Sequence, residues 1–273
     1  MSGHLVDGLR WEIRVRGSGV PQLLLHGFMG RGSSWGAHAA AFARHFRVVV
    51  VDLPGHGRSG IPSEPARASV ERSADDLAVI LALEDCIPAH VLGYSLGARV
   101  ALRLAVSHPA AVRRLVLESP SAGPSTEPER VARRAADFDR ATRLERDGIR
   151  AFVDEWEHEP ALASLGRLPV AAAQRLRAER LRNRPAGLAA SLRGAGQGSM
   201  EPLHERLGAI RAQTLVIAGA LDPIGRARAE AIAARIPAAR LAIVPGAGHA
   251  PHLETPTTFD SLALEFLKED SAA

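Results

Sequence analysis

The chain has 273 residues, of which 46% are hydrophobic and 23% charged, an ordinary composition for a folded globular protein. Its formal net charge of +4 is dominated by arginine, because Lys268 is the lone lysine, and aromatic residues make up only 4%. Surfaces that bind nucleic acids usually interleave basic and aromatic side chains, so we expect no nucleic-acid partner.

Simple counts also disfavour membrane and disulfide-rich classes. The single cysteine, Cys86, excludes a disulfide framework and a cysteine-based metal site, and it fits a reducing compartment. The longest run of Val, Leu and Ile alone, Val48 to Val51, is far shorter than the roughly 20 residues that a membrane span needs. The first residues show no apolar core of a secretion signal. We therefore expect a cytoplasmic protein that does not associate with a membrane.

Short apolar runs alternate with helical patterns along most of the chain, which is typical of an α/β protein with a mostly parallel sheet covered on both faces. Charged and apolar residues alternate over 9–15, which predicts a first strand. Apolar residues recur on one helical face from Val70 to Leu81 and from Phe259 to Leu267. The other predicted strands are Leu23 to Leu25, Val48 to Val51, Val91 to Leu92, Leu115 to Leu117, Leu215 to Ala218 and Leu241 to Val244.

The alternation breaks once, over residues 120–207. This stretch is rich in Ala, Arg and Glu, has helical rather than strand character, and is interrupted by several prolines. Strands resume at Thr214. We interpret residues 120–207 as a helical cap inserted into an α/β core that comprises residues 1–119 and 208–273.

The strongest chemical signal is the motif Gly93-Tyr94-Ser95-Leu96-Gly97. It lies between a predicted strand, 89–92, and a helix that carries Leu96, Val100 and Leu104 on one face. A serine at a strand-to-helix elbow occupies a strained turn, and small residues two positions before and after it prevent clashes with the neighbouring backbone. The motif therefore predicts that Ser95 presents a reactive hydroxyl.

A reactive serine needs a base and an acid, which follow it in the chain in the order acid, histidine. Asp222 lies just beyond the strand 215–218, and His249 lies just beyond the strand 241–244. Both are at carboxyl ends of strands, where open α/β sheets place their sites. We favour Asp222 over Glu118, which ends its own strand, and His249 over the nearby His252.

Two loops complete the predicted site. The backbone N–H groups of Phe28, in the loop 26–30, and of Leu96 could converge on a developing oxyanion. Glycines at positions 27 and 30 would let the backbone approach the substrate. The turn 52–59 is predicted to be structural, with Asp52 as its buttress, and His56 is not expected to be catalytic.

Taken together, the segments 26–30, 52–59, 93–97, Asp222 and 246–249 resemble the α/β-hydrolase superfamily. Within it, the elbow segment 93–99 and the cap segments 152–157, 160–165, 180–185 and 187–194 resemble the MenH group, menaquinone-pathway synthases that expel pyruvate from a cyclohexene carboxylate. The resemblance implies general-base catalysis by Ser95, His249 and Asp222, without a cofactor or metal. It also implies a small-molecule substrate with several carboxylates.

Several residues of the predicted cap also match this group. Carboxylates are bound well by planar guanidinium groups, and Arg133 and Arg180 match the carboxylate-binding arginines of the group. The resemblance implies that Trp156 walls the pocket and that Tyr94, the only tyrosine, points its hydroxyl at the substrate. Arg182 and Arg184, two and four residues further along the same arginine-rich stretch, are alternatives to Arg180.

Two other functions remain open from the sequence. Ser95 could act as a covalent nucleophile in the hydrolysis of an ester, a lactone or a carbon–carbon bond. The fold could also serve as a non-catalytic ligand receptor, although a receptor has no need of a complete triad. The motif departs from the commoner MenH pattern at Ala98, where a second glycine is frequent.

Overall fold

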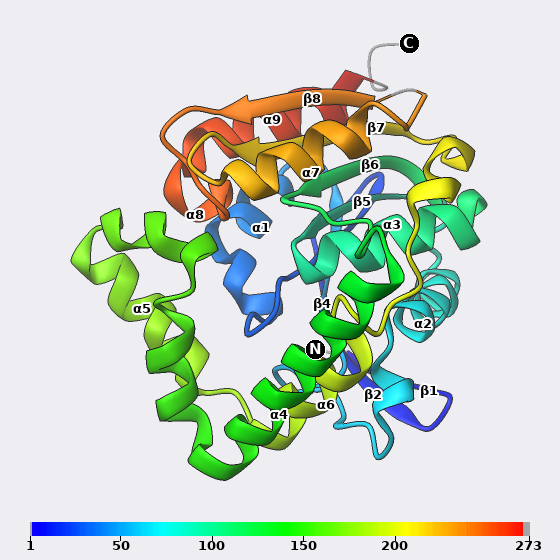
Figure 1. Cartoon of the computed structure of the whole chain (residues 1–273). Helices are drawn as coiled ribbons and strands as arrows, with labels where there is room; N and C mark the ends of the chain where they lie inside the picture. The colour runs from blue at the N-terminus through cyan, green and yellow to red at the C-terminus, as the bar shows by residue number, and fades with distance from the viewer. Residues whose placement is uncertain (1, 238, 270–273) are drawn as a thin grey trace.

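The computed structural model describes residues 2–237 and 239–269 and consists of one twisted sheet with helices on both faces (Figure 1). The sheet has eight strands in the order β1-β2-β4-β3-β5-β6-β7-β8, and this confirms the predicted α/β class. The strands are β1 Ser2–Val6, β2 Leu9–Arg16, β3 Pro21–Leu25, β4 Arg47–Asp52, β5 Ala89–Tyr94, β6 Val112–Glu118, β7 Gln213–Gly219 and β8 Ala239–Val244.

The sheet is parallel from β4 to β8, and only the edge formed by β1 and β2 is antiparallel. Residues 9–15 lie in a strand, β2, as predicted, but it is not the first strand, because β1 precedes β2 and pairs with it through a two-residue turn. Asp7 and Gly8 in that turn both have positive φ, 44° and 72°. An Asp-Gly pair is the usual signal for such a hairpin, and it was present in the sequence.

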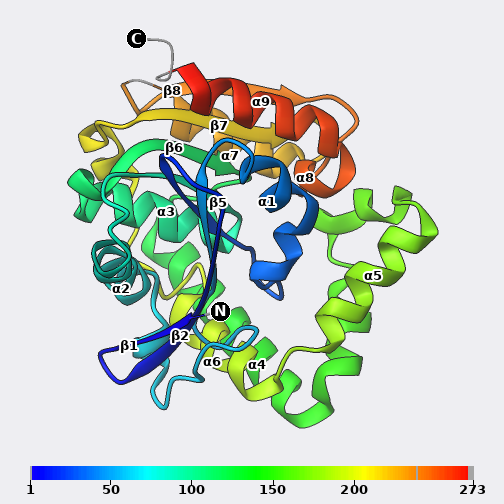
Figure 2. The ribbon, with the colours of Figure 1, turned by 180° about the vertical axis from the view of Figure 1, so that it is seen from behind.

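Helices cover both faces of the sheet, as connections between parallel strands require. Contacts with the sheet place α3 against β5 and α7 against β7 on one face, where α2 packs on α3. Figure 2 shows α1 and α9 together on the other face. The helices of the core are α1 Gly36–Phe42, α2 Val70–Leu83, α3 Leu96–Ser107, α7 Pro223–Ala233, α8 Pro251–Glu254 and α9 Pro256–Lys268, with short 3₁₀ turns η1 Gly32–Trp35, η2 Pro65–Ala68 and η3 Pro109–Ala111.

The two cores are built from alternate residues of the same strands. Along β4, Val49 and Val51 belong to the cluster under α2 and α3, whereas Val48 and Val50 belong to the cluster under α1 and α9. Successive strand side chains point to opposite faces, so a strand buried on both faces is apolar throughout. This is why the central strands appear in the sequence as continuous apolar runs.

Between β6 and β7, the described chain forms α-helices and 3₁₀ turns and no strand. These elements are α4 Glu127–Trp156, η4 Pro160–Arg167, α5 Val170–Leu181, α6 Pro185–Ala195 and η5 His204–Ala209. They extend from the carboxyl end of the sheet (Figure 1), and α6 packs against both α4 and η2. No helix in the described part of the chain is long and apolar enough to cross a membrane.

Candidate active site

Ser95 stands at a sharp turn between β5 and α3. Its φ of 50° lies in a region that residues with a side chain rarely adopt. A Cβ atom on Gly93 would come within 2.3 Å of the carbonyl oxygen of Gly97, and one on Gly97 within 2.2 Å of that of Leu25. Glycine is therefore required on both sides of the serine, because the strand and the helix approach so closely.

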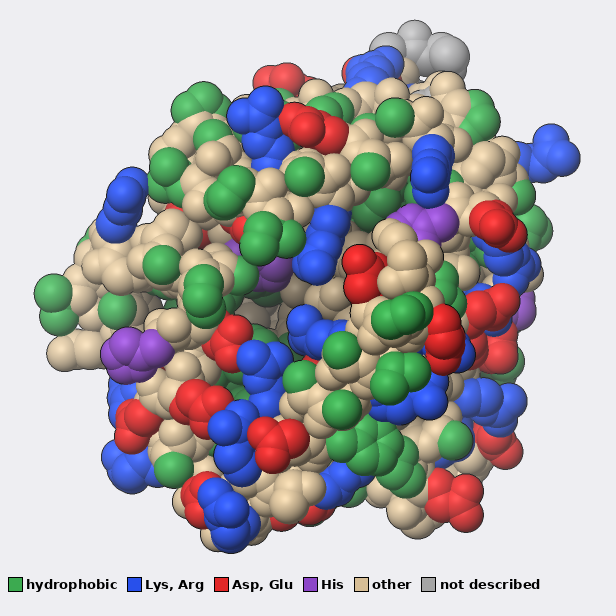
Figure 3. All heavy atoms as spheres, viewed as in Figure 1, with side chains coloured by type: hydrophobic (Ala, Val, Ile, Leu, Met, Phe, Trp, Pro, Cys, Tyr) green, Lys and Arg blue, Asp and Glu red, His purple; other side chains and the backbone are tan. Residues whose placement is uncertain are grey.

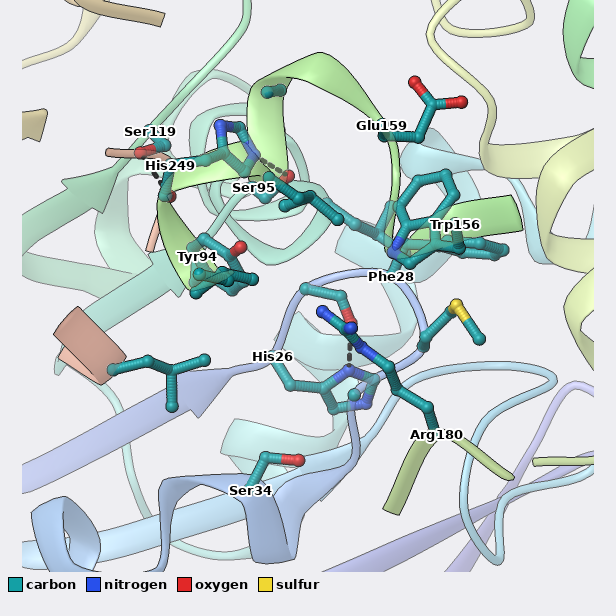
Figure 4. A pocket seen from close by; sticks show the side chains of 18 of the residues that line it. His26, Phe28, Ser34, Tyr94, Ser95, Ser119, Trp156, Glu159, Arg180 and His249 are labelled. Carbon is teal, nitrogen blue, oxygen red and sulfur yellow. Dashed lines mark hydrogen bonds between the residues drawn. The ribbon is translucent and has the colours of Figure 1, made fainter. Parts of the chain in front are cut away.

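The structure brings Ser95, Asp222 and His249 together, although 154 positions separate Ser95 from His249 along the chain. His249 Nε2 lies 3.1 Å from Ser95 Oγ, and His249 Nδ1 lies 2.8 Å from Asp222 Oδ2. A carboxylate accepts but cannot donate, so Nδ1–H donates to Asp222 and Nε2 is left to accept the serine proton. Figure 4 shows the imidazole of His249 directed at Ser95.

Asp222 is held as a carboxylate by its surroundings. Its side chain is buried, and it also caps α7 by accepting the backbone N–H of Gly225 through Oδ1, at 2.9 Å. Burial alone would raise the pKa of Asp222, but the hydrogen bonds from His249 and Gly225 outweigh burial and place this pKa below its ordinary value. The aspartate therefore remains an acceptor that orients the imidazole.

The two alternatives from the sequence form a separate pair. Glu118 Oε1 accepts a hydrogen bond from His252 Nδ1 at 2.8 Å, and both side chains are buried. Neither is hydrogen-bonded to Ser95, His249 or Asp222 through its side chain within the described residues. The side-chain hydrogen bonds that join Ser95, His249 and Asp222 are therefore separate from those of the Glu118–His252 pair.

A cavity of about 520 Å³ opens over Ser95 and His249, between the sheet and the helices of 120–207. Figure 3 shows a hollow on this face with Lys or Arg side chains and a histidine around it. The size is within the range of small-molecule sites, roughly 300 to 1,000 Å³. The wall includes aromatic residues (Phe28, Trp35, Tyr94, Trp156), arginines (Arg99, Arg133, Arg140, Arg175, Arg180, Arg228) and acidic residues (Asp137, Glu159, Glu179).

The two predicted backbone donors both line this cavity. Neither the amide of Phe28 nor that of Leu96 donates to an acceptor among the described residues. Leu96 is the first residue of α3, where amide groups have no partner within the helix. These N–H groups are therefore available to an anion in the cavity.

Gly27 and Gly30 both line the cavity, and the structure adds a packing reason for each glycine. A Cβ atom on Gly27 would lie 2.5 Å from a ring carbon of Tyr94, so this glycine makes room for the tyrosine ring. A Cβ atom on Gly30 would meet the Gly27 carbonyl oxygen at 2.9 Å. Both glycines serve the packing of the loop.

Aromatic side chains form one wall of the cavity. Trp156 lies edge-on to Phe28, with ring centroids 5.2 Å apart, and stacks on Phe152 at 6.0 Å. Tyr94 packs on His252 at 4.6 Å, and burial raises the pKa of its hydroxyl above the ordinary value. The hydroxyl therefore stays protonated, as a hydrogen-bond donor or acceptor in the cavity (Figure 4).

The sequence left Arg180, Arg182 and Arg184 as alternative pocket residues. Of these three, only Arg180 is in the cavity wall. Arg180 is buried and pairs with Glu157 at 3.3 Å, and burial lowers the pKa of its guanidinium. Arg182 and Arg184 are exposed and lie outside the wall, with Arg184 donating to the Ser59 carbonyl.

Arg133 also lines the cavity, but it is already paired. Its Nε donates to the buried carboxylate of Asp137 at 3.0 Å, whereas its terminal nitrogens bond to no described residue. Those nitrogens remain able to bind an anion.

Arg228 and Arg99 are wall residues that sequence reasoning missed. Arg228 projects from the same face of α7 as Gly225, forms no ion pair with a described residue, and has a pKa lowered first by burial and then by the charge of Arg133. Arg99 is buried, and burial lowers its pKa to about 10. Arg99 ends the segment 93–99 that resembles the MenH group, but no role was assigned to it. Nothing in so arginine-rich a sequence distinguished Arg228, except that it is two turns beyond Asp222.

The turn 52–59 supports the loop that carries Phe28. Asp52 accepts the backbone N–H of Gly32 at 2.6 Å and of Arg58 at 2.7 Å, and His56 Nε2 accepts that of Met29 at 3.3 Å. His56 is fully buried, and desolvation lowers its pKa to about 3. A neutral, buried ring that already accepts a backbone hydrogen bond has a structural role, as the sequence predicted.

A strand-to-helix elbow bearing a serine, with a histidine and an aspartate supplied by later strands, is the arrangement of the α/β hydrolases. The model of the alpha/beta hydrolase family matches residues 22–261, and the chain belongs to this family and is an enzyme of it.

Among its relatives are 2-succinyl-6-hydroxy-2,4-cyclohexadiene-1-carboxylate synthases. The one from Enterobacter sp. (strain 638) is 30% identical over 95% of this chain and 96% of its own. A Bacillus subtilis (strain 168) protein, provisionally named as the same synthase, is 36% identical over 96% of both chains. The solved structure of MenH from S. aureus superposes with a TM-score of 0.91, at 32% identity, over 96% of this chain and 98% of the other. A thermophilic esterase from Thermogutta terrifontis, solved with malate bound, has a TM-score of 0.85 at 29% identity, over 96% and 94%.

Proposed function

We propose that this enzyme acts in menaquinone biosynthesis by eliminating pyruvate from 2-succinyl-5-enolpyruvyl-6-hydroxy-3-cyclohexene-1-carboxylate, which leaves 2-succinyl-6-hydroxy-2,4-cyclohexadiene-1-carboxylate. The observation that carries this proposal is a serine, histidine and aspartate in hydrogen-bond contact beneath an arginine-lined cavity. Relatives named for this synthase cover nearly the whole chain, cap included, at up to 36% identity.

Ser95 is the proton acceptor in this mechanism. Asp222 holds the His249 ring so that Nε2 faces the serine hydroxyl, and the ring takes the serine proton as the hydroxyl oxygen removes a proton from the ring carbon next to the succinyl carbonyl. The electron pair then shifts through the ring, the carbon–oxygen bond to the enolpyruvyl group breaks, and pyruvate leaves as its enolate. The enolate takes the proton that His249 received, and this returns the imidazole to its neutral form. General-base catalysis of this kind contributes about 100- to 10,000-fold in rate.

The transient negative charge needs its own stabilisation. As the ring carbon loses its proton, charge accumulates on the succinyl carbonyl oxygen, and the free N–H groups of Phe28 and Leu96 donate to it. Donors that are fixed before the reaction contribute most in such sites, where losing one costs about 100- to 1,000-fold in rate.

The substrate carries three carboxylates, and the cavity wall supplies cations for them. Arg133, Arg180 and Arg228 reach this wall from three different helices. Trp156 covers the apolar part of the ring, and the Tyr94 hydroxyl bonds to a polar substituent. Arg228 has no protein partner among the described residues to compete with a carboxylate.

The direct test is to supply the enolpyruvyl precursor and to measure pyruvate release. We expect the parent enzyme to release pyruvate and Ser95→Ala to lose nearly all activity while it still binds the product. Thr126→Ala, which alters only an exposed helix cap outside the cavity wall, is the matched control and should retain activity. A parent enzyme that releases no pyruvate would contradict the proposal.

Ester hydrolysis is the second candidate, because the Thermogutta terrifontis esterase shares the fold and the same elbow geometry can activate a serine for covalent attack. In that case Ser95 would form an acyl intermediate. Hydrolysis of short aryl esters with a kinetic burst, together with trapping of acyl-Ser95 by mass spectrometry, would favour this reaction. Pyruvate release without an acyl intermediate would exclude it.

A further inference from the structure

Glu118 occupies a central place at the carboxyl edge of the sheet. It ends β6, which lies between β5, the strand before Ser95, and β7, the strand before Asp222. Its backbone carbonyl accepts the N–H of Ser95 at 2.9 Å, so it touches the elbow directly. Its side chain is completely buried, which is rare for a glutamate without a partner.

The partner is the segment that follows His249. Glu118 Oε1 accepts the backbone N–H of His252 at 2.9 Å and the ring Nδ1–H of the same residue at 2.8 Å. His252 is 4% exposed and is the second residue of the short helix α8, which follows the loop that carries His249. Two bonds to one oxygen therefore tie that loop, which leaves β8, back across β7 to β6.

Neighbouring contacts extend the same connection to the reacting groups. Ser119 Oγ, one residue beyond Glu118, donates to the backbone carbonyl of His249 at 2.8 Å, and Ser119 itself has a φ of 48°. The His252 ring packs on Tyr94, which precedes Ser95. The serine side and the histidine side of the site thus share one buried support.

We propose that Glu118 and His252 are positioning residues that hold the Ser95 elbow and the His249 loop at hydrogen-bond distance. The support acts through geometry: Oε1 receives both hydrogen bonds, whereas Oε2 has no partner among the described residues. An amide in place of the carboxylate still offers one acceptor at the same position. The inference rests on the proposed roles of Ser95 and His249, and it does not depend on the substrate.

The test compares Glu118→Ala, Glu118→Gln and His252→Ala. We expect Glu118→Ala to lower kcat for pyruvate release about 10- to 100-fold, since a displacement of about 1 Å can cost that much, and to change KM less than about threefold. Glu118→Gln should stay within about fivefold of the parent. His252→Ala, which keeps the backbone bond, should lie between the two. Asp76→Asn is the matched control, because Asp76 is a buried acceptor, 2.9 Å from Trp11 Nε1, outside the cavity wall.

Two readouts do not require the proposed reaction. One is the rate at which a fluorophosphonate modifies Ser95, and the other is the far-downfield proton resonance of the His249 Nδ1–H donated to Asp222. Both should change in Glu118→Ala and persist in Glu118→Gln and Asp76→Asn. If the parent released no pyruvate, the proposed function would fail while these readouts still tested the support.

Three results would overturn the positioning role. The first is a Glu118→Ala enzyme with parental kcat and an unchanged proton resonance. The second is a Glu118→Gln enzyme as impaired as Glu118→Ala, because charge rather than geometry would then matter. The third is a His252→Ala enzyme with raised KM and unchanged kcat, which would make His252 a substrate-binding residue. If Glu118→Ala does not fold, the Gln and His252 variants decide between these results.

Discussion

At the scale of single residues, charge compensation separates the arginines of the cavity wall. Arg133 and Arg180 each have a carboxylate partner, Asp137 and Glu157, so their charges are partly neutralised before a ligand arrives. Arg228 forms no ion pair in the described chain, although the charges of Asp222 and Glu129 act on it as well as that of Arg133. A guanidinium that has no carboxylate in direct contact and lies near a second guanidinium is a favourable place for a carboxylate.

Replacing Arg228 should therefore weaken substrate binding more than catalysis. We expect Arg228→Ala to raise KM for the tricarboxylate about 10-fold with a smaller change in kcat, the low end for a charge-assisted hydrogen bond because the side chain is partly exposed. Steady-state kinetics would measure this. Arg226→Ala is the control, since Arg226 lies on the same helix but pairs with Glu230 at 2.8 Å on the exposed side. Equal effects of the two variants would contradict a role for Arg228.

At the scale of elements, the loop after β3 is held from two sides. On the core side, His56 accepts the Met29 N–H. On the cap side, Asn183, two residues beyond the end of α5, donates to the Met29 carbonyl at 2.7 Å. The loop also passes directly under the ring of Tyr94, where Gly27 leaves no space for a side chain. Its amide donors are therefore fixed by packing and hydrogen bonds together.

A methyl group at position 27 should disturb both stability and activity. In Gly27→Ala the new Cβ would lie 2.5 Å from the Tyr94 ring, so the loop or the ring must move. We expect a loss of about 1 to 3 kcal/mol in the free energy of unfolding, as for other overpacked sites, and a fall in kcat of at least about 10-fold. Gly166→Ala, with nothing within 4 Å of the new atom, should leave both nearly unchanged. Urea unfolding and pyruvate release measure the two effects.

At the scale of the whole molecule, buried histidines link stability to pH. His26 and His56 pack against each other, with ring centroids 5.0 Å apart, and both accept backbone N–H groups through Nε2. Burial lowers the pKa of both rings, that of His56 to about 3. In the unfolded chain each ring would titrate near 6.5, so between these values the unfolded state binds more protons.

The folded state should therefore be most stable above about pH 6.5 and lose stability as the pH falls towards 3. The expected slope is up to about 1.4 kcal/mol per pH unit for each histidine. Urea midpoints measured between about pH 7 and pH 5 test this, a window above the range in which carboxylates titrate. His56→Gln should reduce the slope, and the exposed His158→Gln should not. A flat profile in the parent would contradict the burial of neutral rings.

The sequence by itself determined the α/β class, the elbow at Ser95 and the order of acid and histidine after it, because these depend on local patterns: apolar runs, glycine spacing and residues at the ends of strands. The hairpin of β1 and β2 was not predicted, although the pair Asp7-Gly8 is typical of such a turn.

Only the tertiary structure decided which groups meet. Asp222 and Glu118 both follow strands, and their different partners, His249 and His252, are set by how the loop after β8 folds back over the sheet. Likewise, Arg180 rather than Arg182 or Arg184 lines the cavity, and Arg228 joins it from the core. These choices depend on packing between segments far apart in the chain, and in a helical cap with many arginines no local pattern distinguishes one face from another.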